Sequence, residues 1–350
     1  SCEFLDAWQR FCRKYVIEMQ QFKYGLLGIL LIALAAMTGC AANSSESVTG
    51  ISGNNPAYSR LVILSDVHLP FRAEKVKEAE RQQRIMDAKN KVINDINGWN
   101  DVNGVAILGD LAASTGNAEE RRAVAQYLSA FEKPLAVING NHDYLYKDEL
   151  SAQGKRIKGT PQERQSKLML FQNNCGLETL YRSKGLAGYR LIFLSANSLT
   201  TSYLTQLSPE ELTWLRQELW EHRTEPTIIF FHAPLAGTIS GYTAPVKIAN
   251  DFAQPAAEIA EILDDNHQVF LWISGHTHTP ATSSNFASEV NLYHGRIWNI
   301  HNADMDRETI WSNSLYLYPD KVIVKTFNHA TGQWLDSLTR TITPPLLTNK

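Results

Sequence analysis

Histidine, aspartate and asparagine residues gather in five short clusters along this chain of 350 residues. These side chains supply the nitrogen and oxygen ligands that divalent metal ions take in proteins. In chain order the clusters are Asp66-Val67-His68, Gly109-Asp110, Gly140-Asn141-His142-Asp143, His232 and Gly275-His276-Thr277-His278. They contain no cysteine, so the set lacks the thiolates of a structural zinc site. It suits hard to borderline divalent ions such as Mn, Fe, Zn, Ni or Co.

An apolar run precedes each cluster. The runs are LVIL, VAIL, LAVI, TIIFF and VFLWI, and runs of this length and composition predict buried strands. In layered α/β folds, functional side chains that follow buried strands gather at one edge of the sheet. Alternation along a strand predicts that Asp66 and His68 point to the same side, as do His276 and His278. Gly275 allows the backbone to approach a metal closely.

The stretches between the clusters predict the rest of an α/β fold. Residues 73–97 and 118–131 carry apolar residues at helical spacing, and residues 255–263 predict a further helix. Ser208-Pro209-Glu210-Glu211 has the N-cap, proline and acidic first turn of a helix start. The polar residues 145–187 leave open a helical cap or a mobile loop. Short strands are expected after residue 290, and they predict a second sheet facing the first.

The ordered pattern D-x-H, G-D, G-N-H-D, H and G-H-x-H resembles the calcineurin-like metallophosphoesterase family. The resemblance runs from Asp66 to His278. It implies a two-sheet β-sandwich flanked by helices in αββα order, with a dinuclear metal site at strand ends. By the same resemblance, one ion is held by Asp66, His68, Asp110 and His278, and the other by Asp110, Asn141, His232 and His276.

Family resemblance also implies the chemistry. Two divalent ions, about 3.5–4 Å apart, clamp a phosphoryl group and acidify a bridging water, whose hydroxide attacks phosphorus. His142 donates a proton to the leaving group, and Asp143 either orients His142 or caps its loop. Many relatives carry a further acid after Gly109-Asp110, where this chain has Ala113. The prediction is a phosphoric ester hydrolase acting on a small-molecule or lipid phosphomonoester or phosphodiester; the alternative is a non-catalytic metal- or ligand-binding lipoprotein with the same fold.

The amino-terminal region predicts export. Residues 26–37 are uncharged and apolar, and they end in Met37-Thr38-Gly39-Cys40, which resembles the lipobox of bacterial lipoproteins. We therefore expect a leader over 1–40. Met19 is a plausible start within it, in which case residues 1–18 would precede the native leader. Lipidation of Cys40, a flexible tether over 41–59 and a metallophosphoesterase domain over 60–345 complete the prediction. An uncleaved membrane anchor is the alternative; both place the domain outside the cytoplasm, on the periplasmic side if the host is Gram-negative.

The net charge and the cysteine content exclude few classes of function. The net charge of −3 gives no electrostatic footprint of nucleic-acid binding, and the oligomeric state stays open. Of the four cysteines, only Cys175 falls in the predicted domain, as a packed residue or a reactive thiol. Some aromatic and histidine side chains are expected either to contact substrate or the outer part of the site, or to pack structurally: Tyr144, Tyr146, Tyr293, Trp298, His294 and His301.

Overall fold

The structure is a computed structural model that describes residues 57–347. Cys40, the predicted leader and the predicted tether as far as residue 56 therefore lie outside the described residues. Within residues 57–347, none of the helices is both long and apolar enough to cross a membrane.

Sheet 1 contains seven strands and holds the first three clusters. Its order is β14-β13-β12-β1-β2-β3, and β15 pairs with β13. The strands β1, β2 and β3 run parallel, and β12 pairs antiparallel with β1. Their bounds are β1 Ser59–Leu64, β2 Val102–Leu108, β3 Leu135–Ile138, β12 Trp311–Leu317, β13 Val322–Asn328, β14 Gln333–Trp334 and β15 Arg340–Ile342.

Sheet 2 contains six strands and holds the last two clusters. Its order is β10-β11-β9-β8-β7-β6, and β11, β9, β8 and β7 run parallel. The bounds are β6 Arg182–Leu186, β7 Tyr189–Phe193, β8 Thr227–Phe230, β9 Val269–Ser274, β10 Leu292–Tyr293 and β11 Ile297–His301. The five apolar runs before the clusters thus form β1, β2, β3, β8 and β9, which confirms the five predicted strands.

Alternating residues of the strands fill different cores. Leu61 and Ile63 of β1 lie in a core between the sheets, where they join Phe193 and Phe230 of sheet 2. Val62 and Leu64 belong instead to a core with α2 and α3. Because both faces of the central strands are buried, their sequences are continuous apolar runs. This arrangement is the predicted two-sheet sandwich.

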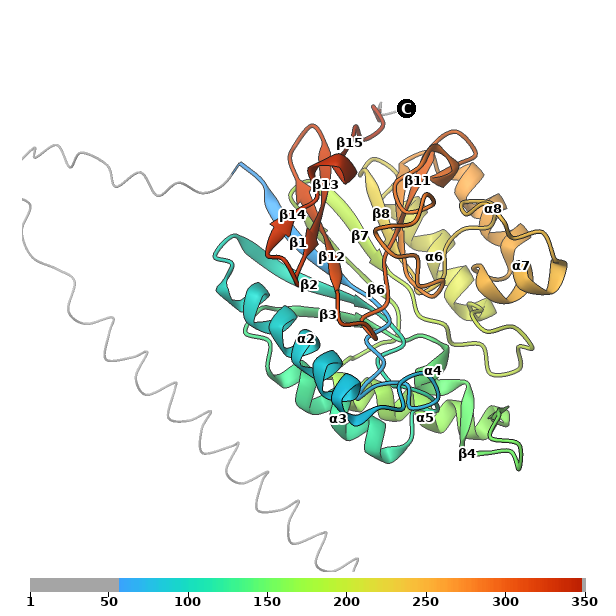
Figure 1. The fold of residues 1–350 in the computed structure, drawn as a ribbon. Helices are drawn as coiled ribbons and strands as arrows, with labels where there is room; N and C mark the ends of the chain where they lie inside the picture. The colour runs from blue at the N-terminus through green and yellow to red at the C-terminus, as the bar shows by residue number, and fades with distance from the viewer. Residues whose placement is uncertain (1–56, 348–350) are drawn as a thin grey trace, which may run out of the picture. The chain divides into compact units, whose positions relative to one another are not determined.

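Helices cover the two outer faces of the sandwich (Figure 1). α2 and α3 pack on sheet 1, while α6 and α8 pack on sheet 2. The helices are α2 Ala79–Gly98, α3 Ala118–Ser129, α4 Asn141–Tyr144, α5 Pro161–Cys175, α6 Pro209–Glu221, α7 Pro245–Asp251 and α8 Ala256–Asp265, with short 3₁₀ turns η1 Glu289–Asn291 and η2 Asp336–Leu338. The αββα prediction is confirmed.

Two regions differ from the expectation. Residues 145–187 are not one loop: they contain a hairpin of β4 (Tyr146–Leu150) and β5 (Arg156–Lys158), then helix α5 and strand β6. The carboxyl-terminal strands do not form the second sheet by themselves. β10 and β11 extend sheet 2, whereas β12–β15 extend sheet 1, because the middle of the chain already supplies β6–β9.

Candidate metal centre

The backbone turns sharply at the residues of the clusters. Five non-glycine residues among them have positive φ: Asp66 51°, His68 50°, Asp110 48°, His276 64° and His278 50°. The expected alternation along an extended strand is therefore wrong, since β1 ends at Leu64 and β9 at Ser274. Left-handed conformations of such residues cost about 1–3 kcal/mol each and persist only where the surroundings fix them.

Main-chain hydrogen bonds between neighbouring loops fix these conformations. The amides of Asp66 and His68 donate to the carbonyls of Gly109 (3.1 Å) and Asp110 (2.9 Å). The amide of Gly275 donates to the His232 carbonyl at 2.8 Å. A Cβ on Gly275 would lie 1.8 Å from Ser65 Oγ, so only glycine permits this approach of the two loops. The sequence predicted that Gly275 lets the backbone approach a metal closely. In the structure, the close approach at Gly275 is that of its loop to the loop of Ser65.

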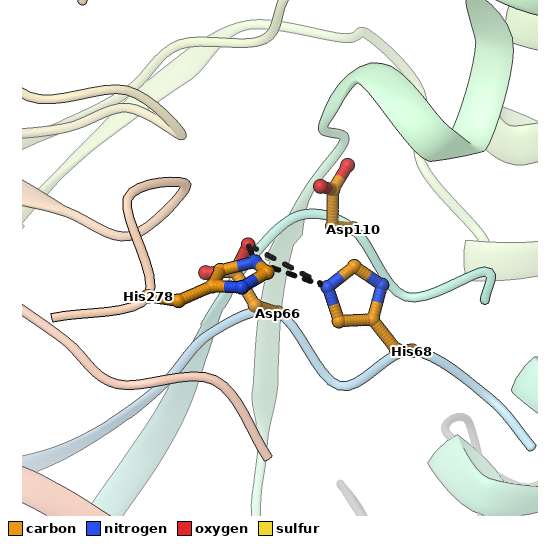
Figure 2. A group of neighbouring side chains, drawn as sticks. All are labelled: Asp66, His68, Asp110 and His278. Atoms are coloured by element: carbon orange, nitrogen blue, oxygen red, sulfur yellow. Dashed lines mark hydrogen bonds and ion pairs between the residues drawn. The ribbon is translucent and has the colours of Figure 1, made fainter. Parts of the chain in front are cut away.

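The first group of candidate ligands, here called site A, contains Asp66, His68, Asp110 and His278. One ligand atom from each lies within 4.8 Å of the others. His278 Nε2 is 3.1 Å from Asp66 Oδ1 and 3.2 Å from His68 Nε2. Figure 2 shows the imidazoles of His68 and His278 turned toward each other beside the Asp66 carboxylate.

The second group, here called site B, contains Asp110, His232 and His276. Their ligand atoms also lie within 4.8 Å of one another. His232 Nε2 is 3.3 Å from Asp110 Oδ2 and 3.1 Å from His276 Nδ1. Asp110 therefore belongs to both groups, which is the geometry of a carboxylate that bridges two cations.

Asn141 follows a glycine that packs against site B: a Cβ on Gly140 would lie 2.3 Å from Asp110 Oδ1 and 2.7 Å from His232 Nε2. Asn141 is buried, and its Oδ1 has no hydrogen-bond partner among the described residues. An orphaned buried oxygen beside converging imidazole nitrogens is costly without a cation. The residues present therefore fit a pair of divalent ions.

Carbonyl groups orient the imidazoles of site B. His232 Nδ1 lies 2.7 Å from the Leu108 carbonyl, and His276 Nε2 lies 3.0 Å from the Asn250 carbonyl. A carbonyl only accepts, so these nitrogens carry the protons. The opposite nitrogens of both rings face each other, so they are the atoms that would ligate a metal.

Behind His278 of site A lies a charged network that the sequence analysis missed. Arg72 donates to Asp304 (2.9 Å) and Asp306 (3.1 Å), and one of its nitrogens is 3.3 Å from His278 Nδ1. Arg307 pairs with Asp304 and also donates to the His278 carbonyl at 3.2 Å. A usable signal existed, because Asp304 and Asp306 follow β11, whose parallel pairing with β9 brings its carboxyl end to the same edge.

Lys89 of α2 completes this network. Its side chain is fully buried, and Nζ donates to the carbonyls of His68 (2.9 Å) and Pro70 (2.8 Å). Nζ also lies 3.3 Å from Asp306 Oδ1. Burial lowers the pKa of Lys89 to about 8, although Asp306 opposes the shift. Lys89 thus ties the loop that carries His68 to helix α2.

The charges of the two groups are strongly interdependent. Burial alone would raise the pKa of Asp110, but His232 and His142 outweigh it and hold this pKa well below its usual range. Burial would lower the pKa of His232, but Asp110 raises it to about 9. For His276, burial and the nearby His232 lower the pKa to about 4. His276 is therefore neutral at pH 7, whereas His232 is protonated beside Asp110 and would have to release that proton to bind a metal.

His142 lies beside both groups and belongs to neither. Its Nδ1 is 2.6 Å from the Ser114 carbonyl, and its Nε2 is 3.9 Å from Asp110 Oδ2. Burial lowers the pKa of His142, while Asp110 opposes that shift. Nε2 is thus the ring atom that faces the centre.

Asp143 caps the loop and does not orient His142. Its carboxylate accepts from the amides of Ala112 (2.9 Å) and Gly140 (2.8 Å). The Ser114 carbonyl holds the His142 ring instead. Of the two interpretations that the sequence left open for Asp143, the structure favours loop capping.

Most of the remaining candidates have structural surroundings. Tyr144 and Tyr293 lie in the core of sheet 2, and Trp298 packs against the core between the sheets. His301 is buried and bonds the Thr238 carbonyl, whereas His294 is an exposed partner of Asp264. Burial raises the pKa of Cys175 to about 12, so its thiol is unreactive near neutral pH. Tyr146 differs, because its ring contacts that of His142, with centroids 5.6 Å apart.

Comparison with known proteins places this geometry in context. The family model described as calcineurin-like phosphoesterase matches residues 59–280. No curated protein sequence matches the chain. A dimetal phosphatase from Danio rerio is similar in structure, with a TM-score of 0.53, 15% identity, and coverage of 82% of this chain and 99% of that chain. A purple acid phosphatase from yellow lupin has a TM-score of 0.51 and 14% identity over 82% of this chain and 54% of its own.

Proposed function

The chain belongs to the calcineurin-like phosphoesterase family, and from this premise we propose that it hydrolyses a phosphomonoester or phosphodiester with two divalent ions. Site A would hold one ion through Asp66, His68, Asp110 and His278. Site B would hold the other through Asp110, Asn141, His232 and His276. The observation that carries the proposal is Asp110, which the structure places in both ligand groups.

The bound ions would supply Lewis-acid chemistry, neutralising charge on the phosphoryl oxygens and acidifying a water. The chain's own residues arrange that chemistry. Hydrogen bonds to backbone carbonyls leave one ring nitrogen of His232 and one of His276 directed at the centre. The unpartnered Asn141 Oδ1 would add a neutral ligand. Asp110 would then be the one carboxylate among the four proposed ligands of site B.

His142 is the proposed proton donor to the leaving oxygen. Nδ1–H donates to the Ser114 carbonyl, which fixes the ring and aims Nε2 at the space beside Asp110. In its protonated form His142 carries a second N–H at Nε2, and this proton would pass to the departing alkoxide. Proton transfer from a positioned side chain typically contributes about 10²–10⁴-fold in rate.

A direct test uses the manganese-loaded protein with p-nitrophenyl phosphate and bis(p-nitrophenyl) phosphate, with bound metal measured by elemental analysis. We expect metal-dependent release of p-nitrophenol. His142→Gln should lower kcat by about 10²–10⁴-fold and leave the metal content at the wild-type value. Two bound ions without turnover of either ester would instead support the binding-protein alternative.

The proposed location is outside the cytoplasm, on a lipid anchor at Cys40. It is supported by the uncharged run over residues 26–37 and the lipobox-like Met37-Thr38-Gly39-Cys40. Cells supplied with radiolabelled palmitate should label the protein, and Cys40→Ala should abolish the label. Equal labelling of the Cys40→Ala variant would contradict the proposal.

A further inference from the structure

The β4–β5 hairpin lies beside the proposed proton donor. Tyr146, the first residue of β4, packs its ring 5.6 Å from the His142 ring. The guanidinium carbon of Arg156, the first residue of β5, lies 5.5 Å from the centroid of the Tyr146 ring. Tyr146 is buried, and burial raises its pKa while the positive charge of Arg156 opposes the rise. The order His142, Tyr146, Arg156 thus leads outward from the centre.

Arg156 has one ion-pair partner among the described residues, Glu74. This residue lies on the loop that follows the first cluster, and the two side chains are 3.1 Å apart. The Arg156 side chain is 33% exposed and that of Glu74 is 48% exposed. Exposed pairs of this kind contribute little, about 0–1 kcal/mol, so an incoming anion can replace Glu74 at small cost.

The other arginines near the centre are already neutralised. Arg72 is buried and pairs with both Asp304 and Asp306, while Arg307 pairs with Asp304. Breaking the pairs of Arg72 is costly, because a desolvated charge would lose its partner. The Arg307 side chain is 34% exposed, but its partner Asp304 is 4% exposed and would lose a neutralising charge in the same way. Arg156 is therefore the guanidinium best placed to exchange its partner for a charged substrate group. A guanidinium recognises carboxylates and phosphates through paired N–H donors.

We propose that Arg156 determines substrate specificity by binding an anionic group, a carboxylate or a second phosphate, on the leaving alcohol of the phosphoester. Glu74 is the partner that the substrate anion replaces, and Tyr146 positions the guanidinium beside His142. The inference rests on the proposed function, because His142 defines the leaving-group side. It narrows the substrate class to esters whose alcohol carries negative charge.

The test compares phenyl phosphate with 3-carboxyphenyl phosphate, and their methyl diesters if the enzyme prefers diesters. A carboxylate at the meta position leaves the acidity of the phenol nearly unchanged, so selectivity reports binding of the charge. The readout is the ratio of kcat/KM for the carboxylated ester to that for the plain ester. The wild-type ratio should exceed one, and Arg156→Gln should lower it roughly tenfold, mainly through KM.

Two further variants separate recognition from support of the hairpin. Glu74→Gln removes the competing carboxylate and should raise the ratio, opposite in sign to Arg156→Gln. Lys147→Gln is the matched control: Lys147 lies on the same hairpin, is also 33% exposed and pairs with Glu163, so the ratio should stay unchanged. If the bridge only held the hairpin, Glu74→Gln and Arg156→Gln would shift the ratio in the same direction, and the inference would be wrong.

Bound metal is measured by elemental analysis in the wild type and in the Arg156→Gln, Glu74→Gln and Lys147→Gln variants. This measurement separates failure of the Arg156 proposal from failure of the proposed function. Turnover of both esters with a wild-type ratio near one would overturn the role of Arg156 and leave the phosphoesterase proposal intact. No turnover of any ester by wild-type protein that holds two ions would overturn both. A loss of bound metal in Arg156→Gln would mean that the residue supports the centre, and it would contradict a role confined to substrate.

Discussion

Sites A and B share Asp110 but rest on different supports. The imidazole of His278 in site A is backed by Arg72, and Asp304 and Asp306 balance that charge. The imidazoles of site B are backed by two backbone carbonyls, those of Leu108 and Asn250. His68 of site A also has a backbone carbonyl behind it, that of Ala112 at 3.4 Å. The two halves thus differ at His278, which depends on buried ionic side chains, whereas both imidazoles of site B depend on the main chain.

The contrast extends to the buried carboxyl groups around each half. Near site A, Asp304 and Asp306 are paired with arginine and lysine. Glu211 is buried with one hydrogen bond, from the Ser195 amide at 2.9 Å, and burial raises its pKa well above the usual range. It lies behind site B through Ser195, whose Oγ accepts from the Asn139 amide at 3.4 Å, one residue before Gly140. The buried charge near site A is therefore paired, whereas the surroundings of Glu211 disfavour the charged form of its carboxyl. Substitutions should affect the two halves differently.

The largest effect is expected where the two halves meet. Asp110→Asn removes the negative charge shared by both ligand groups, so both ions should bind weakly and kcat/KM should fall by at least about 10³-fold. Elemental analysis and p-nitrophenyl ester turnover provide the measurement. Asp87→Asn, at an exposed position of α2, is the control and should match wild type. Retention of two ions by Asp110→Asn would contradict its role as the bridge.

A second substitution breaks the ionic support of site A. Lys89→Met leaves the carbonyls of His68 and Pro70 without their donor and removes one cation from Asp306. The free energy of unfolding in urea should fall by about 3 kcal/mol. Lys91→Met on the same helix removes a 47% exposed lysine paired with Asp95 and should cost less than about 1 kcal/mol. Equal losses for the two variants would mean that the buried network is energetically unimportant.

Local sequence patterns predicted the strands and the residues that follow them, because burial on both faces leaves continuous apolar runs such as LVIL and VFLWI. Clustering at the carboxyl ends of the strands followed from parallel pairing within each sheet, but the sequence did not show that two sheets contribute to the site. Alternation failed as a guide to Asp66 and His68, because both have left-handed backbones in a loop held by the second cluster. Tertiary hydrogen bonds set such conformations, and no local pattern shows them.

Other parts of the fold had signals that the sequence analysis did not use. Thr160-Pro161 with Glu163 forms a capping box and a proline start for α5, and Gly176 ends that helix in a left-handed conformation. The network of Arg72 and Asp304 had a weaker signal, the position of Asp304 after a strand. Its members are more than 200 positions apart in sequence, and their types alone suggest ordinary surface charges. The two loops meet through tertiary contacts such as the hydrogen bond from the Met305 amide to the Asp66 carbonyl at 3.0 Å.

Asp304 supports site A through its side chain, whereas Asn250 supports site B through its backbone carbonyl. Asp304→Asn leaves Arg72 with less neutralising charge beside His278, so one of the two ions should bind about 10–100-fold more weakly. Asn250→Ala keeps the carbonyl that orients His276, so both affinities should stay near wild type. Metal titration with separate determination of the two affinities is the measurement. The comparison fails if Asn250→Ala weakens binding as much as Asp304→Asn.

The smallest effect is expected behind site B, at Glu211. Its buried carboxyl has a raised pKa in the folded chain, whereas the unfolded chain ionises near about 4.3. As pH rises above that value, the unfolded state releases the proton and the folded state keeps it, so this group makes the protein less stable with increasing pH. Glu211→Gln resembles the protonated group and does not titrate. Its free energy of unfolding should equal that of wild type near pH 4 and exceed it at pH 8.

Urea unfolding of Glu211→Gln and wild type across this range measures the difference, and Glu210→Gln serves as the exposed neighbour on the same helix. The control should show no such divergence, because Glu210 is exposed to solvent in the folded chain. A wild-type protein that gains stability relative to Glu211→Gln from pH 4 to pH 8 would mean that Glu211 is an ionised, stabilising group. The carboxyl behind site B would then resemble those behind site A, and the contrast between the two halves would be lost.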